Sequence, residues 1–422
     1  DGRVHDSNRI DFLDKYISCL QKAVDEGADV RGYFLWTFLD NFEWDKGYSE
    51  RFGLVYVDYL TQKRIAKDSA YWYQQVMETN GRNLSINMNK KEIIYMNPVF
   101  KQMIWGGDKL GTEWHYDIPG DNTGECWAVS AHPSGDCTIK EGTYAGKTLS
   151  QLWTEEPELF GNVDNDRFPL LIKIIDAKDD LSIQVHPDDD YAMRVEGEPG
   201  KTEMWYIMDA EPGAFLYYGF KEEISKEEFA KRIEEDTLLD VLNAVPVQKG
   251  DVLFIESGTI HAIGKGILIA EIQQNSNVTY RVYDYGRVGK DGKKRDLHIE
   301  KALAVTNRVP IVKDKSSYPH VADCDYFTVD KLNLDGTFMK KMEGTVSDAS
   351  FASVLFLDGE GTITNDGEIL PFKKGDSFFL TAGSGSYTVE GRCDALVTTI
   401  REKAAPVRIG IDIGGTQTKI GL

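Results

Sequence analysis

The stretch KGDVLFIESGTIH, residues 249–261, recurs with changes as KGDSFFLTAGSGS, residues 374–386. Each matched pair of positions is separated by 125 residues. In both copies a Lys-Gly-Asp turn leads into an apolar run, and a turn containing glycine follows, a pattern typical of β-structure. The repetition predicts two copies of one β architecture in this chain.

This repeated motif resembles the second motif of cupins, which are antiparallel jelly-roll barrels. The resemblance implies two cupin-like barrels. The copies differ at one position of chemical consequence, His261 in the first and Ser386 in the second. Because cupins place a metal ligand at this position, we expect a metal site in the first barrel and a structural role for the second.

A second stretch, SIQVHPDDD from Ser182 to Asp190, separates Gln184 and His186 by two residues. Side chains at this spacing lie on the same face of a strand. Such a pair is commonly a satisfied polar pair or part of a wet surface strand. Together with Glu203 in GKTEMWY and His261, however, it offers two imidazoles, a carboxylate and an amide oxygen. This set suits Zn²⁺, with water or substrate completing the shell.

Longer segments carry a more specific resemblance. They are FPLLIKIIDAKDDLSIQVHPDD (168–189), GKTEMWY (200–206), GTIHAIGKG (258–266) and AEIQQNSNVTYRVYDYGR (270–287). Through them, residues 88–403 resemble the class I mannose-6-phosphate isomerases. The resemblance implies one Zn²⁺ per chain, held by Gln184, His186, Glu203 and His261, and interconversion of mannose 6-phosphate and fructose 6-phosphate through an enediolate.

The same resemblance assigns the arginine of the family to Arg281 and its active-site lysines to Lys173 and Lys201. An arginine can stabilise a negative oxygen or clamp an anionic group through its planar fork. Lys201 precedes Glu203 by two residues and could bind phosphate or steady developing charge. A positioned carboxylate could move the proton, and the sequence leaves Glu271 and Asp284 as candidates.

Residues 1–84 carry WTFLDNFEWDKGYSERFGLVYVDY (36–59) and KDSAYWY (67–73). Both resemble the C-terminal end of family-one glycoside hydrolases, which are (β/α)₈ barrels. The resemblance assigns sugar binding to Trp36, Glu43 and Trp44. It also places both catalytic carboxylates upstream of Asp1, so we expect an inactive α/β fragment. We predict a buried strand over residues 30–38 between helices that start near Asn8 and at residue 69.

The final stretch, VRIGIDIGGTQTKIGL (407–422), resembles the start of sugar kinases of the ROK type. The family's phosphate motif corresponds to Asp412, Gly414, Gly415 and Thr416. We expect a β-hairpin or a disordered tail here, because no kinase domain follows in this chain.

Composition narrows the classes of function. Of the 422 residues, 41% are hydrophobic and 28% charged, as in globular proteins of several domains. The net charge of −21 argues against nucleic acid as a partner but not against a small phosphorylated sugar. Five scattered cysteines without CxxC spacing indicate reduced thiols and a cytoplasmic protein. We expect neither a membrane span nor a signal peptide.

The sequence therefore predicts a mainly β chain in four parts. Residues 1–84 form the hydrolase-like fragment, 88–310 the metal-binding cupin with a helical insertion at about 222–245, 311–403 the second cupin, and 405–422 the kinase-like tail. The insertion is a solvated helix or a lid over the cleft. Two other functions stay open, a β-glucosidase and a non-catalytic cupin that senses sugar through its metal.

Overall fold

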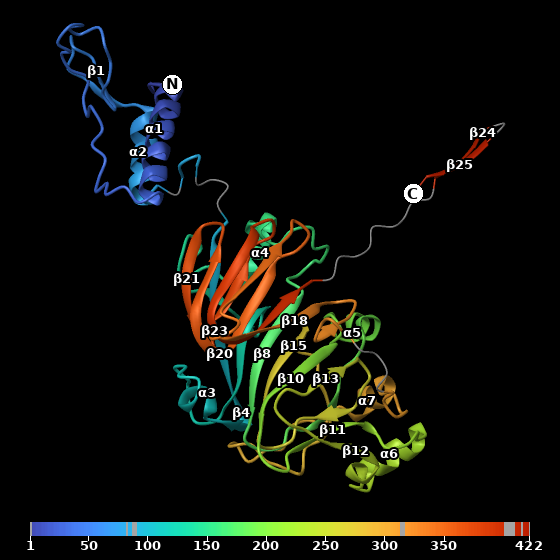
Figure 1. Cartoon of the computed structure of the whole chain (residues 1–422). Coiled ribbons are helices and arrows are strands. Elements are labelled where there is room, and N and C mark those ends of the chain that lie inside the picture. The colour runs from blue at the N-terminus through green and yellow to red at the C-terminus, as the bar shows by residue number, and fades with distance from the viewer. Residues whose placement is uncertain are drawn as a thin grey trace. The chain divides into compact units, whose positions relative to one another are not determined.

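The computed structural model describes residues 2–81, 83–86, 91–312, 317–400, 410–414 and 417–421. Its residues fall into two compact units, 1–90 and 91–422 (Figure 1). Among the described helices, none is long and apolar enough to cross a membrane.

The first unit contains two helices and one small hairpin, namely α1 (Ser7–Asp25), β1 (Val55–Val57), β2 (Arg64–Ala66) and α2 (Asp68–Glu78). Asp6 joins the helices, because its carboxylate accepts hydrogen bonds from the backbone N–H and the hydroxyl of Ser69. The prediction of a buried strand over residues 30–38 is wrong. Backbone hydrogen bonds join Thr37 to Phe52 and Leu54, but no strand forms and Phe34 is exposed. A strand needs partners and cover, and this unit supplies little of either.

The first barrel of the second unit is made of two facing sheets. The seven-stranded sheet has the order β13 (Val252–Ile255), β10 (Glu203–Ala210), β15 (Ile267–Gln274), β8 (Leu170–Ala177), β4 (Val99–Gly107), β5 (Thr123–His132) and β6 (Gly135–Asp136). The five-stranded sheet has the order β12 (Leu242–Pro246), β11 (Phe215–Phe220), β14 (His261–Ala262), β9 (Ile183–Val185) and β16 (Tyr280–Tyr283). Trp205 and Ile207 of the first sheet pack with Leu216 of the second, so an apolar core lies between the sheets.

A nine-stranded sheet forms the second barrel. Its main path is β17 (Ala322–Asp323), β18 (Thr328–Asp335), β23 (Gly385–Thr399), β20 (Ala352–Asn365), β22 (Ser377–Leu380), β3 (Ile93–Asn97) and β7 (Thr138–Ile139). Strand β19 (Lys341–Val346) pairs with β23, and β21 (Glu368–Lys373) pairs with β20. Strands β3 and β7 come from the early part of the unit, so hydrogen bonds tie the start of this unit to the second barrel.

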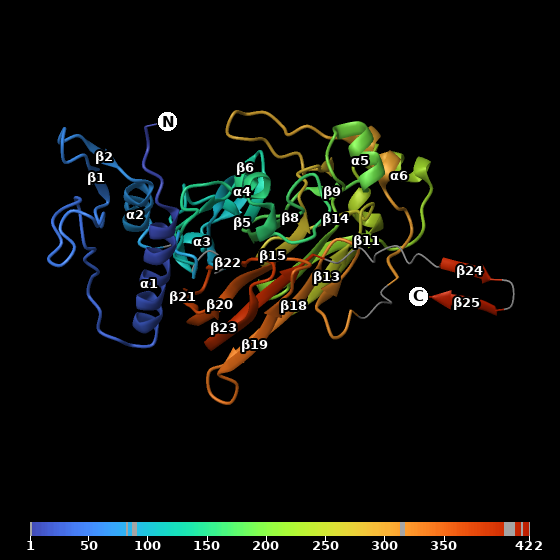
Figure 2. The same ribbon diagram turned by 90° about the horizontal axis from the view of Figure 1, so that it is seen from above.

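Short helices cover the sheets. They are α3 (Lys109–Thr112), α4 (Leu149–Glu155), α5 (Asp189–Glu196), α6 (Lys226–Glu234) and α7 (Ile299–Val305), with 3₁₀ turns at Pro157–Leu159 and Leu238–Val241. Figure 2 shows α5 and α6 beside the five-stranded sheet. The insertion predicted at 222–245 is helical only over α6 and the second 3₁₀ turn, because residues 242–245 join β12. Phe229 of α6 packs on Phe220, and the charged residues around it face outward.

The sequence repeat is also a structural repeat. Gly250 and Gly375 have φ angles of 95° and 92°, which favour glycine. The N–H of Gly250 donates to the carbonyl of Ile207 on β10, and the N–H of Gly375 donates to that of Phe356 on β20, each at 2.8 Å. The two copies of the motif therefore form the same turn, attached to a neighbouring strand in the same way.

The tail contains β24 (Gly410–Gly414) and β25 (Gln417–Gly421), which pair in antiparallel fashion. The predicted hairpin is present. Asp412 and Gly414 lie on β24, whereas Gly415 and Thr416 lie outside the described residues.

Candidate active site

Three of the predicted metal ligands meet inside the first barrel. His186 follows β9, Glu203 opens β10 and His261 opens β14. Nε2 of His186 lies 3.6 Å from Oε2 of Glu203, and Nε2 of His261 lies 3.3 Å from Oε1 of the same carboxylate. The potential ligand atoms of all three residues lie within 4.8 Å of one another, and each residue is buried. This arrangement suits a single metal ion.

Both imidazoles are oriented for metal binding. Nδ1 of His186 lies 3.0 Å from the carbonyl oxygen of Val278, and Nδ1 of His261 lies 2.8 Å from that of Thr259. With Nδ1–H donating to a carbonyl, each Nε2 presents a lone pair. Both Nε2 atoms and Oε2 of Glu203 are buried without a hydrogen-bond partner. Leaving such atoms unpaired costs free energy, so these residues fit a bound cation.

Local electrostatics also favour the protonation states in which these side chains can bind a metal ion. Burial lowers the pKa of His186 to about 3, assisted by the charge of Lys201, so the imidazole is neutral. Burial by itself would raise the pKa of Glu203. The positive charge of Lys201, whose Nζ lies 3.5 Å from the carboxylate, opposes burial, and the pKa of Glu203 lies well below its usual range.

Gln184 and Arg281 share the face of His261. On β9, Gln184 is directly opposite His261 of β14 and Arg281 of β16. Residues directly opposite in neighbouring strands point to the same side of a sheet. Nη1 of Arg281 donates to the carbonyl of Asp296 at 2.9 Å, which helps to fix its guanidinium. The role of Gln184 as the fourth ligand stays a prediction.

A ladder of buried polar groups crosses the inner face of the seven-stranded sheet. Trp205, Glu271, Lys173 and Trp127 lie opposite one another on β10, β15, β8 and β5. Nζ of Lys173 is 3.3 Å from Oε1 of Glu271 and 3.7 Å from Oε2 of Glu125. The indole N–H of Trp205 donates to Oε2 of Glu271 at 2.9 Å, and Trp205 also packs edge-on against His261. The ladder thus reaches the metal ligands.

Burial sets the protonation tendencies of the ladder. It raises the pKa of Glu271, as does the charge of Glu203, and Lys173 offsets this only in part. Burial by itself would lower the pKa of Lys173, but Glu125 and Glu271 hold it above its usual value. Lys173 therefore remains charged, while Glu271 takes a proton more readily than an ordinary carboxyl group does.

Sequence reasoning did not find Glu125 or Trp205. A signal was present, because Glu125 and Trp127, like Glu203 and Trp205, are separated by two residues and so share a strand face. The other candidate base, Asp284, takes a different role. Its carboxylate accepts hydrogen bonds at 2.6–2.8 Å from Arg287 and Arg295, so it joins the loop residues that follow β16.

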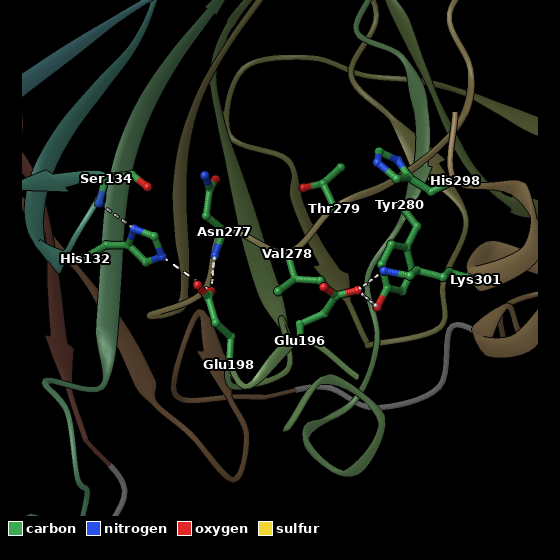
Figure 3. Close-up of a pocket in the computed structure, with 10 residues that line it drawn as sticks. All are labelled: His132, Ser134, Glu196, Glu198, Asn277, Val278, Thr279, Tyr280, His298 and Lys301. Atoms are coloured by element: carbon green, nitrogen blue, oxygen red, sulfur yellow. Dashed lines mark hydrogen bonds and ion pairs between the residues drawn. The ribbon is translucent and has the colours of Figure 1, made fainter. Parts of the chain in front are cut away.

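A polar cavity of about 300 Å³ adjoins this site. Figure 3 shows two groups of lining residues in direct contact, Glu198 with His132, and Glu196 with Lys301 and Tyr280. Val278, whose carbonyl oxygen lies next to His186, is part of the wall. No local sequence pattern pointed to this cavity, since its lining comes from strands, helices and loops far apart along the chain.

The fold and site thus define a cupin-type protein with a buried group of two histidines and one carboxylate that could hold a metal ion. The family described as "Phosphomannose isomerase type I, catalytic domain" matches residues 93–213, and "Mannose-6-phosphate isomerase, cupin domain" matches residues 317–400. Mannose-6-phosphate isomerase ManA of Bacillus subtilis is 42% identical over 318 residues, which are 73% of this chain and 98% of that protein. The chain belongs to the type I phosphomannose isomerase family.

Solved structures agree with this assignment. A crystal structure of the mannose 6-phosphate isomerase from Bacillus subtilis is 41% identical, with a TM-score of 0.68, over 73% of this chain and 99% of that one. A zinc-bound mannose 6-phosphate isomerase shares the fold at 17% identity, with a TM-score of 0.57, over 73% of this chain and 99% of that one. The prediction of a mainly β, cupin-like fold is confirmed.

The first unit has relatives of its own. "Glycosyl hydrolase family 1" matches residues 1–82, and β-glucosidase A of Thermotoga maritima is 63% identical over 81 residues. These residues are 19% of this chain but only 18% of that protein, so a β-glucosidase function finds little support. The indole N–H of Trp36 donates to Glu43 at 3.0 Å, and Trp44 is 94% exposed. Sugar binding by these residues and the kinase resemblance of the tail stay predictions.

Proposed function

We propose that this protein is a zinc-dependent isomerase that interconverts mannose 6-phosphate and fructose 6-phosphate. The observation that carries the proposal is the buried group of His186, Glu203 and His261, in which both Nε2 atoms lack a hydrogen-bond partner. The chain is also 42% identical to ManA, and the matched region covers 98% of ManA. All five cysteines are free thiols, in agreement with a reducing cytoplasm.

One zinc ion per chain would be held by Gln184, His186, Glu203 and His261. When bound, it supplies a Lewis acid that polarises the oxygens of the substrate. The protein contributes the orientation of its ligands through the carbonyl groups of Thr259 and Val278, and it excludes bulk water from the site.

Arg281 and Lys201 would handle the negative charge of the substrate. Arg281 lies on the face of the metal ligands and can bind the phosphate or the developing enediolate through a planar pair of N–H groups. Lys201 is buried beside Glu203, where a fixed positive charge is worth more than in water.

Glu271 would move the proton between C1 and C2. Its raised pKa brings the carboxyl group closer to the range in which it can both accept and release a proton near neutral pH. Trp205 fixes one carboxylate oxygen, while Lys173 lies beside the other and balances its charge when the proton has left.

The test is a coupled assay for conversion of mannose 6-phosphate, before chelation, after chelation and after Zn²⁺ is restored. We expect activity to disappear with the metal and return with it. A folded chain that retains zinc and produces no fructose 6-phosphate would contradict the proposal and favour a sugar sensor.

A further inference from the structure

The carboxylate of Asp189 joins three parts of the second unit that lie far apart along the chain. Its Oδ1 accepts hydrogen bonds from the backbone N–H of Gly200 at 2.8 Å and from the side-chain amide of Gln274 at 2.9 Å. Its Oδ2 accepts one from the hydroxyl of Tyr326 at 2.9 Å. Asp189 opens α5 and Gln274 ends β15, whereas Tyr326 lies between β17 and β18 of the second barrel. A single side chain therefore connects α5 and the end of β15 to the second barrel.

The two segments that meet at this carboxylate carry predicted metal ligands. The carboxylate lies three residues after His186, and Gly200 lies three residues before Glu203. Beside it, the backbone N–H of Lys201 donates to the carbonyl of Pro187 at 3.0 Å. The position of Lys201 and Glu203 relative to His186 therefore depends on contacts in which this carboxylate takes part.

The same two segments are in direct backbone contact. A Cβ atom at Gly200 would lie 2.5 Å from the backbone nitrogen of Asp189 and 2.5 Å from the carbonyl carbon of Asp188, so a larger residue would push the segments apart. Gln274 holds the next part of the chain, because its Oε1 accepts a hydrogen bond from the N–H of Thr202 at 2.9 Å. A displacement of the Asp189 side chain would thus be passed on to Thr202, directly before the predicted ligand.

The second barrel also packs against the strand that carries Glu203. Side chains alternate along β10, so Met204 and Tyr206 point away from the face of Glu203. Both belong to the same buried apolar cluster as Phe327 of the second barrel. Phe327 directly follows Tyr326, so the packed contact between the barrels fixes the place from which the Tyr326 hydroxyl donates its hydrogen bond.

We propose that the second barrel positions the metal site of the first barrel through the hydroxyl of Tyr326. By donating to Asp189, Tyr326 holds the segment that carries Lys201 and Glu203 against the segment that carries His186. Tyr326 and Asp189 are then positioning residues, because they act on the ligands only through other contacts. The proposal rests on the proposed zinc site and gives a task in it to the barrel that has no predicted ligands.

The test measures the dissociation constant of Zn²⁺, by competition with a chelator, for the full chain and for its variant Tyr326→Phe. We expect the constant to rise by about tenfold, since residues that orient metal ligands from outside typically change metal affinity by 10–100-fold. Tyr116→Phe is the matched control. It also removes a tyrosine hydroxyl that donates to the second barrel, but the acceptor is the carbonyl of Gly375, so the zinc affinity should not change.

Two further measurements separate positioning from a general loss of stability. With Co²⁺ in place of Zn²⁺, the visible absorption spectrum reports the geometry of the ligands, and it should change in Tyr326→Phe but not in Tyr116→Phe. Asp189→Asn should weaken zinc binding as well. If Tyr326 acts through Asp189, adding Tyr326→Phe to Asp189→Asn should change the dissociation constant by less than about twofold.

An unchanged zinc affinity and cobalt spectrum in Tyr326→Phe, whatever its Tm, overturns the proposal, as does an equal loss of affinity in Tyr116→Phe. If circular dichroism shows that Tyr326→Phe does not fold, Asp189→Asn decides. Normal zinc affinity in a folded Asp189→Asn, or failure of both variants to fold, overturns the proposal.

The unmodified chain separates this proposal from the proposed function. If it binds zinc but produces no fructose 6-phosphate, the isomerase function fails while the positioning role can still be confirmed by the zinc measurements. If it binds no zinc, both proposals are overturned.

Discussion

The two cupin barrels contain the same turn, but the residues that follow it have different roles. In the first barrel the backbone N–H of Gln248 donates to Oδ2 of Asp251 at 2.9 Å, and in the second Lys373 donates to Asp376 at the same distance. Past these turns the copies diverge. His261 is buried beside His186 and Glu203, with which it could hold a metal ion, whereas Ser386 lies exposed on β23. The repeat therefore encodes backbone geometry, and the metal chemistry depends on single positions added to it.

The interiors of the two barrels also differ, because one holds buried charged groups and the other an apolar core. The first holds Lys173, Glu203 and Glu271, and burying such charges is costly even when they are paired. The core of the second is apolar, and within it Phe356 stacks on Phe372 with ring centroids 3.7 Å apart. Well-packed apolar side chains are a favourable source of stability. We infer that the second barrel stabilises the unit, whereas the first accommodates the polar site.

The sharpest test of this contrast exchanges the matched positions for alanine. His261→Ala should abolish zinc retention and isomerase turnover, because the site loses one of two imidazole ligands. Ser386→Ala should leave both unchanged, since its side chain faces solvent. Metal analysis and the coupled assay measure both effects. A full complement of zinc in His261→Ala would refute the ligand set.

Glu271→Gln should separate metal binding from proton transfer. We expect zinc content to stay at its normal level and kcat to fall by roughly 10²–10⁴-fold, the range typical of general acid–base catalysis. The amide cannot carry the proton, but it can still accept the hydrogen bond of Trp205. A decrease in kcat of less than tenfold would show that another group moves the proton.

The matched turns allow a comparison of stability. Asp376→Ala should lower the free energy of unfolding by about 1–3 kcal/mol, because a partly buried hydrogen bond to a carboxylate is lost. Asp251→Ala should lower it by less, because the matching hydrogen bond is exposed to solvent. The effect of Asp376→Ala should be the larger, since this carboxylate also accepts a hydrogen bond from Tyr95 at 2.5 Å. Urea unfolding measures both.

Zinc content separates the same two variants. Asp251→Ala should weaken zinc retention, because β13 follows this turn and its Ile255 pairs with Glu203. Asp376→Ala should leave zinc content unchanged. Zinc loss of equal size in both variants would contradict the division between the barrels.

Replacement of Asp284 should have the smallest effect on stability, and this effect should depend most on pH. Burial would raise its pKa, but hydrogen bonds from Arg295 and Arg287 outweigh burial and lower it. Its stabilising contribution is then present above the unfolded carboxyl pKa of about 4 and is lost as pH falls through the lower folded value. Asp284→Asn should therefore reduce Tm most at pH 7, and the difference from the unmodified chain should shrink below about pH 4. A difference that stays constant with pH would disprove this account.

The fold could be predicted well from particular residues. Gly250 and Gly375 mark turns that need positive φ, and strand alternation put Gln184 and His186 on one face. Features that depend on contacts between distant parts of the chain could not be predicted. The segment 30–38 has a strand composition but lacks neighbours in this unit, and Asp284 was a candidate base until the structure showed two arginines beside it. A carboxylate's role depends on its partners, and these come from elsewhere in the chain.

The sequence by itself determined the repeat, the difference between His261 and Ser386, and the family to which residues 93–400 belong, because turn residues and metal-binding side chains leave local patterns. Only the tertiary structure showed that Glu125, Lys173, Glu271 and Trp205 form one ladder that reaches the metal ligands. These residues contact one another across neighbouring strands. The register of the strands decides which buried charges meet, and burial decides in which direction their pKa values shift. No local sequence pattern fixes either of them.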